Sequence, residues 1–198
     1  MKPRLILAST SPRRRELLGA LGLPFEIQPS DFDEDAVPVG DSSPEDWVIT
    51  LAAGKARAVA LQVQENAIVI GADTTVVLDG ACLGKPKDPE DACRMLRSLS
   101  GRTHTVCTGL AIIQVTNGEA QSPITDVVST DVVFDELTDE VIEAYVATGE
   151  PLDKAGSYGI QGKALSFIPR ISGDYFNVVG LPLNRLVSLL KQQGISVW

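Results

Sequence analysis

The sequence predicts a mixed α/β fold in a single domain that spans residues 1–198. Two kinds of segment support this class: apolar or β-branched runs typical of buried strands, and helix starts marked by a capping residue followed by proline. The two kinds alternate along most of the chain, as expected when helices pack against a sheet. With 198 residues, 44% of them hydrophobic, the chain can enclose its own core.

A capping residue followed by proline marks three helix starts. The sequences SPRR, SPED and DPED each place a side-chain acceptor before the first helical turn. A threonine before DEVIEAYV and a glycine after it delimit a fourth helix, and the last apolar segment before Gly194 forms a fifth. The helices are therefore expected over residues 12–21, 44–64, 89–98, 138–148 and 181–193.

Strands are expected where apolar and β-branched residues follow one another. Residues 4–8 and the run AIVIGA at 67–72 suit strands buried on both faces, and the second continues to residue 78 and a turn at Asp79-Gly80. Two long β-branched runs joined by TNGEAQSP favour antiparallel neighbours, and two short runs around Ser-Gly-Asp favour a hairpin. These two pairs cover residues 103–115 with 124–134, and 165–171 with 175–179.

Charge, cysteine and histidine content argue against several classes of protein. Seventeen basic and 26 acidic residues give a net charge of −9, which predicts no broad binding to nucleic acid or to an anionic membrane. Three cysteines without a C-x-x-C pair predict neither a disulfide framework nor a cysteine zinc site, and they fit a reducing cytoplasm best. The one histidine, His104, excludes a multi-histidine metal site and is expected in a strand. Neither a signal peptide nor a membrane-spanning segment is expected.

The stretch ASTSPRRRE at residues 8–16 is basic although the whole chain is acidic. The other two proline-marked helices begin with acidic residues, as the helix dipole favours, whereas three arginines follow the proline here. Unpaired N–H groups at the helix start, together with Arg13, Arg14 and the hydroxyls of Ser9 and Ser11, favour a phosphate site. The alternative is that Ser11 only caps the helix and the arginines are solvated.

Asp73 interrupts the apolar strand IVIGADTTVVL. A buried carboxylate needs a cation, a metal or hydrogen-bond donors as partner. With Asp33 or Glu34 from the acidic segment before the second helix, Asp73 can hold Mg²⁺, which prefers oxygen ligands and often shares them with substrate phosphates. It can equally accept a proton from an attacking water. The alternative is an aspartate at a bulge or tight turn.

Two lysines and one glycine-rich segment extend the candidate site. Lys55 lies in a strongly helical stretch, and Lys85 lies in a Gly-Lys-Pro loop that is too short for a Walker A motif and lacks its Ser/Thr. The segment DKAGSYGIQG at residues 153–162 can approach a ligand closely and read its hydrogen bonds. The alternatives are a surface lysine, an ordinary turn and a glycine-rich connector.

Taken together, these motifs resemble the Maf family of nucleoside triphosphate pyrophosphatases. The matching segments follow in order along essentially the whole chain: LILASTSPRR, IVIGADT, LGKP, RSLSGRTHTVCTG, EPLDKAGSYGIQG and GDYFNVVGLPL. The resemblance implies an elongated, curved sheet flanked by helices, two lobes around a central cleft as in inosine-triphosphatase-like folds, and a homodimer. It also implies metal-dependent hydrolysis, with Mg²⁺ or alternatively Mn²⁺, that gives a nucleoside monophosphate and pyrophosphate.

The resemblance further implies roles for particular residues. Asp73 is expected to be the catalytic carboxylate, with Glu34 as the second carboxylate at the metal and the site. The expected phosphate contacts are Ser9, Arg13, Arg14, Lys55 and Lys85, the two lysines counting as catalytic. The residues that match positions of substrate choice are Arg13, Thr74 and Gln161.

The segment YGIQG is similar to the branch that acts on dTTP and UTP. We expect the Gln161 amide to pair with the O4 and N3–H edge of thymine or uracil. Because the family is also associated with inhibition of septum formation, a nucleotide-binding regulator of cell division is an alternative function. A pyrophosphatase for modified or methylated purine nucleotides is another.

Overall fold

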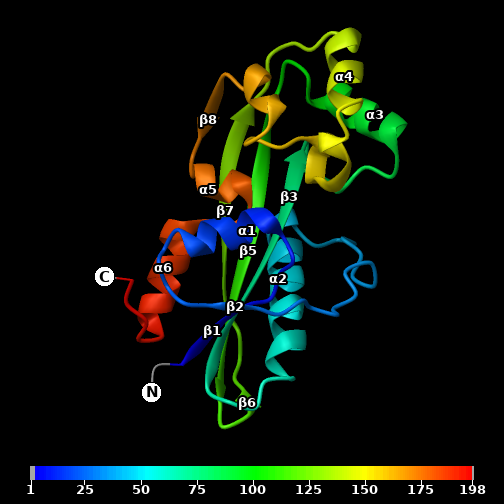
Figure 1. Ribbon diagram of the computed structural model, residues 1–198. Helices are drawn as coiled ribbons and strands as arrows, with labels where there is room; N and C mark the ends of the chain where they lie inside the picture. Colours follow the sequence, from blue (N-terminus) through cyan, green and yellow to red (C-terminus); the bar gives the residue numbers. More distant parts are fainter. Residues whose placement is uncertain (1–2, 198) are drawn as a thin grey trace.

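The computed structural model describes residues 3–197 and has a central mixed β-sheet with helices on both faces (Figure 1). Within these residues eight strands form the sheet, in the order β2-β1-β3-β5-β7-β8, with β4 added beside β3 and β6 beside β5. β1 is parallel to both of its neighbours, and the other pairs are antiparallel. The strands are β1 (Arg4–Leu7), β2 (Glu26–Ile27), β3 (Ala67–Leu78), β4 (Ala81–Leu83), β5 (Thr103–Thr116), β6 (Glu119–Ala120), β7 (Ile124–Val133) and β8 (Arg170–Ser172).

The helices lie between these strands and after the last one. They are α1 (Pro12–Gly19), α2 (Pro44–Ala60), α3 (Pro89–Leu99), α4 (Asp139–Val146), α5 (Tyr175–Val179) and α6 (Leu183–Gln192), and three 3₁₀ segments follow α4: η1 (Glu150–Asp153), η2 (Ala155–Ser157) and η3 (Lys163–Phe167). Among residues 3–197, no helix combines the length and the apolar character needed to cross a membrane.

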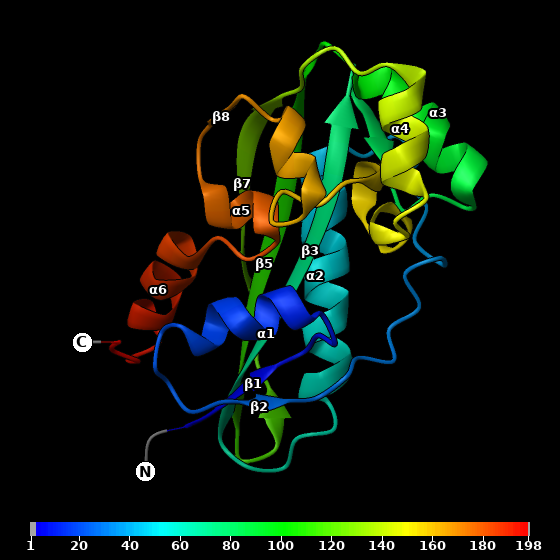
Figure 2. The same cartoon turned by 45° about the horizontal axis from the view of Figure 1, so that its top comes forward.

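Two long strands, β3 and β5, form the spine of an elongated molecule (Figures 1 and 2). They pair continuously from Ala67 opposite Val115 to Val77 opposite Thr105. Helices α3 and α4 lie at one end of this spine, and α1, α2 and α6 surround its other part. The mixed α/β fold expected from the sequence is therefore confirmed.

The core consists of apolar clusters on both faces of the sheet and at one end. On one face, Leu5 and Leu7 of β1 pack with α1 and α6. On the other face, Ile6 packs with the small residues of α2. A third cluster joins α3, α4 and the 3₁₀ segments to the far end of β3 and β5. Because each fully buried leucine or isoleucine contributes about 1.5–3 kcal/mol, these clusters stabilise the packing of the helices on the long strands.

Most expected elements are confirmed, with ends that differ by a few residues. α1 ends at Gly19 and α2 at Ala60, both earlier than expected. The expected turn at Asp79-Gly80 is present, with positive φ at both residues. His104 lies buried in β5, where its Nε2 is 2.8 Å from the hydroxyl of Tyr158 and its ring packs edge-on against Phe134. The prediction that His104 lies in a strand is thus confirmed.

The expected hairpin over residues 165–171 and 175–179 is wrong. The first segment is split between η3 and β8, which pairs with β7, and the second segment is the helix α5. The carboxylate of Asp174 accepts a hydrogen bond from the N–H of Phe176 at 2.8 Å, which caps the helix, and Gly180 ends it with φ +117°. Capping and the burial of Asn177 outweigh the β propensity of YFNVV.

Candidate active site

The candidate site lies where one edge of β3 has no strand beside it. β1 pairs with residues 67–70 and β4 with residues 76–78, so no strand in the described part of the chain pairs with this edge at residues 71–75. Asp73 lies at the centre of this interval, within an unbroken strand. The alternative of a bulge or tight turn at Asp73 is therefore wrong, and the interval lets side chains from both faces of the sheet meet.

Two glycines bring α2 close enough to reach Asp73. A Cβ atom at Gly71 would lie 2.2 Å from the carbonyl oxygen of Ala52, and one at Gly109 would lie 2.4 Å from that of Val48. Gly109 is the cross-strand partner of Asp73, so both glycines share its face of the sheet. The backbone of α2 therefore packs directly on the strands.

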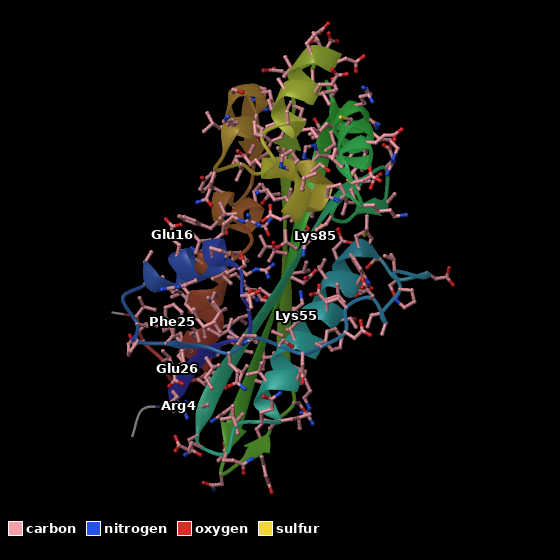
Figure 3. All side chains as sticks on the ribbon, turned by 45° about the vertical axis from the view of Figure 1, so that its right-hand side comes forward. Arg4, Glu16, Phe25, Glu26, Lys55 and Lys85 are labelled. Atoms are coloured by element: carbon pink, nitrogen blue, oxygen red, sulfur yellow. The ribbon has the colours of Figure 1, made fainter. Side chains whose placement is uncertain are left out.

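Lys55 comes from α2 and forms a buried ion pair with Asp73. The distance from Lys55 Nζ to Asp73 Oδ1 is 2.5 Å, and the two residues are only 9% and 8% exposed. Figure 3 labels Lys55 on α2, together with Lys85 nearer to α3. The alternative of a solvated surface lysine is therefore wrong for Lys55. Its ammonium instead neutralises a carboxylate that burial would otherwise destabilise.

Glu34 is the second carboxylate at Lys55, with Oε2 at 2.8 Å from Nζ. Its loop is held on α2 because the ring of Phe32 lies where a side chain on Gly54 would be, 2.3 Å from an added Cβ, and because Trp47 donates a hydrogen bond to the carbonyl of Val37. The neighbouring Asp33 also lines the cleft, but its carboxylate accepts a hydrogen bond from a backbone N–H two residues on. Glu34, not Asp33, makes the contact with Lys55.

Arg14 approaches from the opposite face of the sheet. Its guanidinium donates to the carbonyl of Gly180 at 2.8 Å, to Thr74 Oγ1 at 3.0 Å and to Ser9 Oγ at 3.5 Å. Burial lowers the pKa of Arg14 and the nearby Asp73 carboxylate opposes this, but an arginine pKa is high enough for the group to stay charged. Arg14 is thus a positioned cation.

The start of α1 differs from the starts of α2, α3 and α4. Ser43, Asp88 and Thr138 each accept a hydrogen bond from an N–H in the first turn of their helix, and acidic residues follow. Ser11 occupies the corresponding position in α1, but its side chain makes no such bond within the described structure, and no acidic residue lies in the first turn. The expected capping by Ser11 is therefore not seen, and the positive end of α1 faces the cleft.

The other wall comes from the β4–α3 loop and the glycine-rich segment. Lys85 is exposed in this loop, where the N–H of Gly156 donates to the carbonyl of Gly84. Arg13 lies 3.9 Å from Asp153, and Gln161 is exposed at the cleft.

The glycine-rich segment is a packed turn and not a loose connector. Glu150 accepts hydrogen bonds from the hydroxyl of Tyr145 and from the N–H of Lys163. A Cβ atom at Gly162 would lie 2.0 Å from the carboxylate of Glu150, and one at Gly159 would lie 2.6 Å from the side chain of Lys154. The glycines therefore allow the segment to close over these side chains.

A single cleft of about 1020 Å³ brings the expected site residues together. All nine line it: Ser9, Arg13, Arg14, Glu34, Lys55, Asp73, Thr74, Lys85 and Gln161. The charges around the whole cleft are balanced, because the complete set of lining residues includes five lysines or arginines and five aspartates or glutamates. The cleft is therefore not strongly positive by itself.

Several residues of the site region were not expected from the sequence. Phe32 and Trp47 line the cleft and hold the loop of Glu34, and Thr108 and Asn177 lie behind Thr74. The glycine inside the helical stretch LAAGKARAV was a signal for Phe32, because a mid-helix glycine often marks a close approach. Nothing in the sequence pattern indicated the second pair.

Comparison with known proteins decides the family. The family model described as Maf-like protein matches residues 4–193. The chain belongs to the Maf family. Curated relatives of this family are similar over nearly their whole length: a dTTP/UTP pyrophosphatase of Moorella thermoacetica is 55% identical, covering 98% of this chain and 97% of that protein, and one of Anaeromyxobacter dehalogenans is 51% identical, covering 100% and 97%.

The Maf chain also shares its fold with a more distant solved structure. A HAM1 protein from Coxiella burnetii superposes with a TM-score of 0.51 at 16% identity, covering 96% of this chain and 99% of that one. The likeness confirms the fold at low sequence identity.

Proposed function

We propose that this protein is a nucleoside triphosphate pyrophosphatase that hydrolyses dTTP and UTP to the nucleoside monophosphate and pyrophosphate. The observation that carries this proposal is the Asp73–Lys55 pair at the centre of a cleft whose other face presents Arg14 and the uncapped start of α1. The names of the relatives, dTTP/UTP pyrophosphatase, supply the substrate class. One domain, residues 1–198, carries the whole activity.

Phosphate groups bind at the start of α1. Ser9, Arg13 and the free N–H groups of the first turn meet them from one side, while Arg14 and Lys85 add charge from two directions. Breaking a phosphoanhydride needs charge neutralisation and positioning more than covalent chemistry. No serine or cysteine nucleophile is therefore required.

Asp73 accepts the proton of the attacking water. An unpaired carboxylate beside phosphates would repel them, and the Lys55 ammonium at 2.5 Å offsets this repulsion while fixing the carboxylate in place. The glycine contacts of α2 keep Lys55 at this distance. Positioned proton transfer of this kind contributes about 10²–10⁴ in rate.

Glu34 and Asp73 are the residues that would hold a divalent metal. Both carboxylates already converge on one cation, Lys55 Nζ, and the described residues contain no group of three His, Cys, Asp or Glu side chains that could hold a metal without other ligands. Such a pair suits Mg²⁺, or alternatively Mn²⁺, which takes one or two carboxylates and completes its shell with water and phosphate oxygens. When bound, the metal supplies the positive charge that the balanced cleft lacks for a polyanionic substrate.

Base selection is assigned to Gln161, Arg13 and Thr74. The Gln161 amide has both a donor and an acceptor for the O4 and N3–H edge of thymine or uracil, and its exposure in the cleft leaves both free to a ligand. A purine-directed pyrophosphatase is the alternative that nucleotide competition would reveal.

Three further expectations belong to this proposal. We infer a homodimer in the cytoplasm, on the family resemblance and on the three unpaired cysteines. The net charge of −9 supports the expectation that neither nucleic acid nor membrane is a partner. The regulator of septum formation is the less favoured function, because a pure binder does not need Asp73 beside phosphates and the relatives' names are those of enzymes.

The test is pyrophosphate release from a panel of nucleoside triphosphates, with Mg²⁺ and with a chelator. Metal-dependent release from dTTP and UTP, with little from CTP or purine nucleotides, is the expected result. Binding without release from any triphosphate would replace this proposal with the regulator. Light scattering on a sizing column gives the oligomeric state in the same preparation.

A further inference from the structure

A chain of hydrogen bonds leads from the cleft into the core behind Thr74. Arg14 Nη2 is 3.0 Å from Thr74 Oγ1, which is 2.9 Å from Thr108 Oγ1, and this atom is 3.0 Å from the carbonyl oxygen of Asn177. Thr74 lines the cleft, whereas Thr108 and Asn177 do not line it and are fully buried. The chain therefore has one end in the binding site and the other in the core.

The direction of every bond in this chain is determined by its two ends. A guanidinium only donates, and a carbonyl oxygen only accepts. Thr108 has one hydroxyl hydrogen, which it donates to Asn177, so Thr74 must donate its own hydrogen to Thr108. Thr74 then has no hydrogen left for a ligand and one lone pair that is not used by Arg14.

The buried end of the chain is itself fixed. The side-chain amide of Asn177 donates to the carbonyl of Val106 and to Thr130 Oγ1, each at 2.9 Å. Thr130 in turn donates to the carbonyl of Asp174 and accepts from its N–H. These bonds hold the first turn of α5 on β5 and β7, so the acceptor for Thr108 cannot turn away.

We propose that Thr108 and Asn177 are positioning residues that make Thr74 an obligatory hydrogen-bond acceptor toward the cleft. Thr74 therefore recognises an N–H or O–H donor of the nucleoside and disfavours a group that only accepts. Ionised phosphate oxygens only accept, so they are not its partners. This inference rests on the proposed function for the class of ligand, a nucleoside triphosphate.

Two donors are common to dTTP and UTP: N3–H of the base and the 3′-hydroxyl of the sugar. CTP replaces the first with an acceptor, and 3′-O-methyl-UTP replaces the second with an acceptor. The two nucleotides therefore distinguish the two sources of the same chemistry.

The experiment measures binding by calorimetry with the non-hydrolysable α,β-methylene analogues of UTP, CTP and 3′-O-methyl-UTP, in Mg²⁺. In the wild type we expect at least one of CTP and 3′-O-methyl-UTP, each of which lacks one of the two donors, to bind about tenfold or more weaker than UTP. In Thr108→Val, the hydroxyl of Thr74 loses its internal acceptor and can donate to the ligand. The preference for UTP over the weaker-binding nucleotide should therefore fall about tenfold. Thr74→Val should lose the same preference.

Two controls separate positioning from damage. Thr108→Ser restores the hydroxyl and should restore the preference. Thr105→Val removes a hydroxyl from the same strand β5, but on the opposite face, where it contacts Asp131, and should leave the preference unchanged. Thr108→Val should fold, because the carbonyl of Asn177 still accepts the N–H of Gly180 at 3.0 Å.

The preference must fall in both Thr108→Val and Thr74→Val for the proposal to stand. Ratios that stay within about twofold of wild type in both variants, or no preference in the wild type, would overturn it. Because the measurement needs no turnover, absence of pyrophosphate release would count against the proposed enzyme activity and not against this inference.

Discussion

One carboxylate oxygen of Asp73 forms an ion pair with Lys55. Replacing the carboxylate by an amide keeps the shape of the side chain while removing its charge. We expect Asp73→Asn to lower kcat by about 10²–10⁴ while changing nucleotide binding less, since the proton acceptor is lost. Steady-state pyrophosphate release measures this. Asp79→Asn is the matched control, because Asp79 follows the same strand in an exposed turn and pairs with Arg102. A near-normal kcat in Asp73→Asn would remove its role as base.

Glu34 and Asp33 are adjacent carboxylates with different contacts. Because Glu34 contacts Lys55 beside Asp73 and Asp33 does not, we expect Glu34→Gln to raise the Mg²⁺ concentration for half-maximal activity about tenfold or more. Asp33→Asn should leave that concentration nearly unchanged, since its carboxylate bonds only to its own loop. A Mg²⁺ titration of both variants decides, and equal shifts would contradict the assignment to Glu34.

Gln161 is the residue at which base selection is expected to be most easily altered. Its side chain is exposed and makes no part of the core, so Gln161→Ala should not change the free energy of unfolding by more than about 0.5 kcal/mol. The ratio of kcat/KM for dTTP to that for CTP should fall about tenfold, because a hydrogen-bonded base edge loses its partner. An unchanged ratio would count against this pairing.

Helix α2 depends on contacts that only glycine allows. In Gly109→Ala the new methyl would meet the backbone of Val48 and Ile49 at 2.4–2.7 Å, so the helix must shift away from the sheet. We expect a loss of about 1–3 kcal/mol in the free energy of unfolding, and a fall in kcat as Lys55 moves from Asp73.

The matched control for this element is Gly19→Ala. A Cβ atom there would meet only the ring of Phe25, at an ordinary contact distance of 3.9 Å, and α1 would gain helix propensity. Denaturant unfolding and activity of the two variants test the idea together. Equal stability in both would show that α2 tolerates displacement.

Among the helices and strands, the sequence predicts those whose formation depends on neighbouring residues in the chain. The buried strand around Asp73 and the three proline-marked helices followed from local residues alone. Helix α5 did not, because YFNVV has strand propensity and becomes helical through its cap on Asp174 and its packing on β5 and β7. The contact of Glu34 with Lys55 also escaped prediction, since it depends on Phe32 lying against Gly54 across the loop.

The pH dependence of the whole molecule should include a contribution from His104. Burial lowers its pKa to about 4, below the ordinary value of 6.5, so the unfolded chain binds a proton more readily than the folded one. The stabilisation is therefore complete above about pH 6.5 and is lost as pH falls toward 4. Between pH 7 and pH 5 we expect a loss of about 2 kcal/mol from this group.

Denaturant unfolding at several pH values measures this loss, with His104→Gln as the comparison. The variant lacks the titrating group, so its stability should change less over this interval even if it is lower throughout. Parallel curves for the two proteins would assign the pH dependence to other groups.

Within the described chain, residues 71–75 of β3 have no strand beside them on one edge. This gap divides the site into two parts in which substitutions have different consequences. β3, which carries Asp73, pairs with β5 along its other edge, while Arg13 and Lys85 lie in segments that follow the ends of β1 and β4, and Gln161 lies in the glycine-rich segment. The exposed side chains of Lys85 and Gln161 can be replaced at little cost in folding. The architecture therefore separates the site into a rigid part, in which the sheet fixes Asp73 and Thr74, and a peripheral part whose exposed side chains can change without disturbing the sheet.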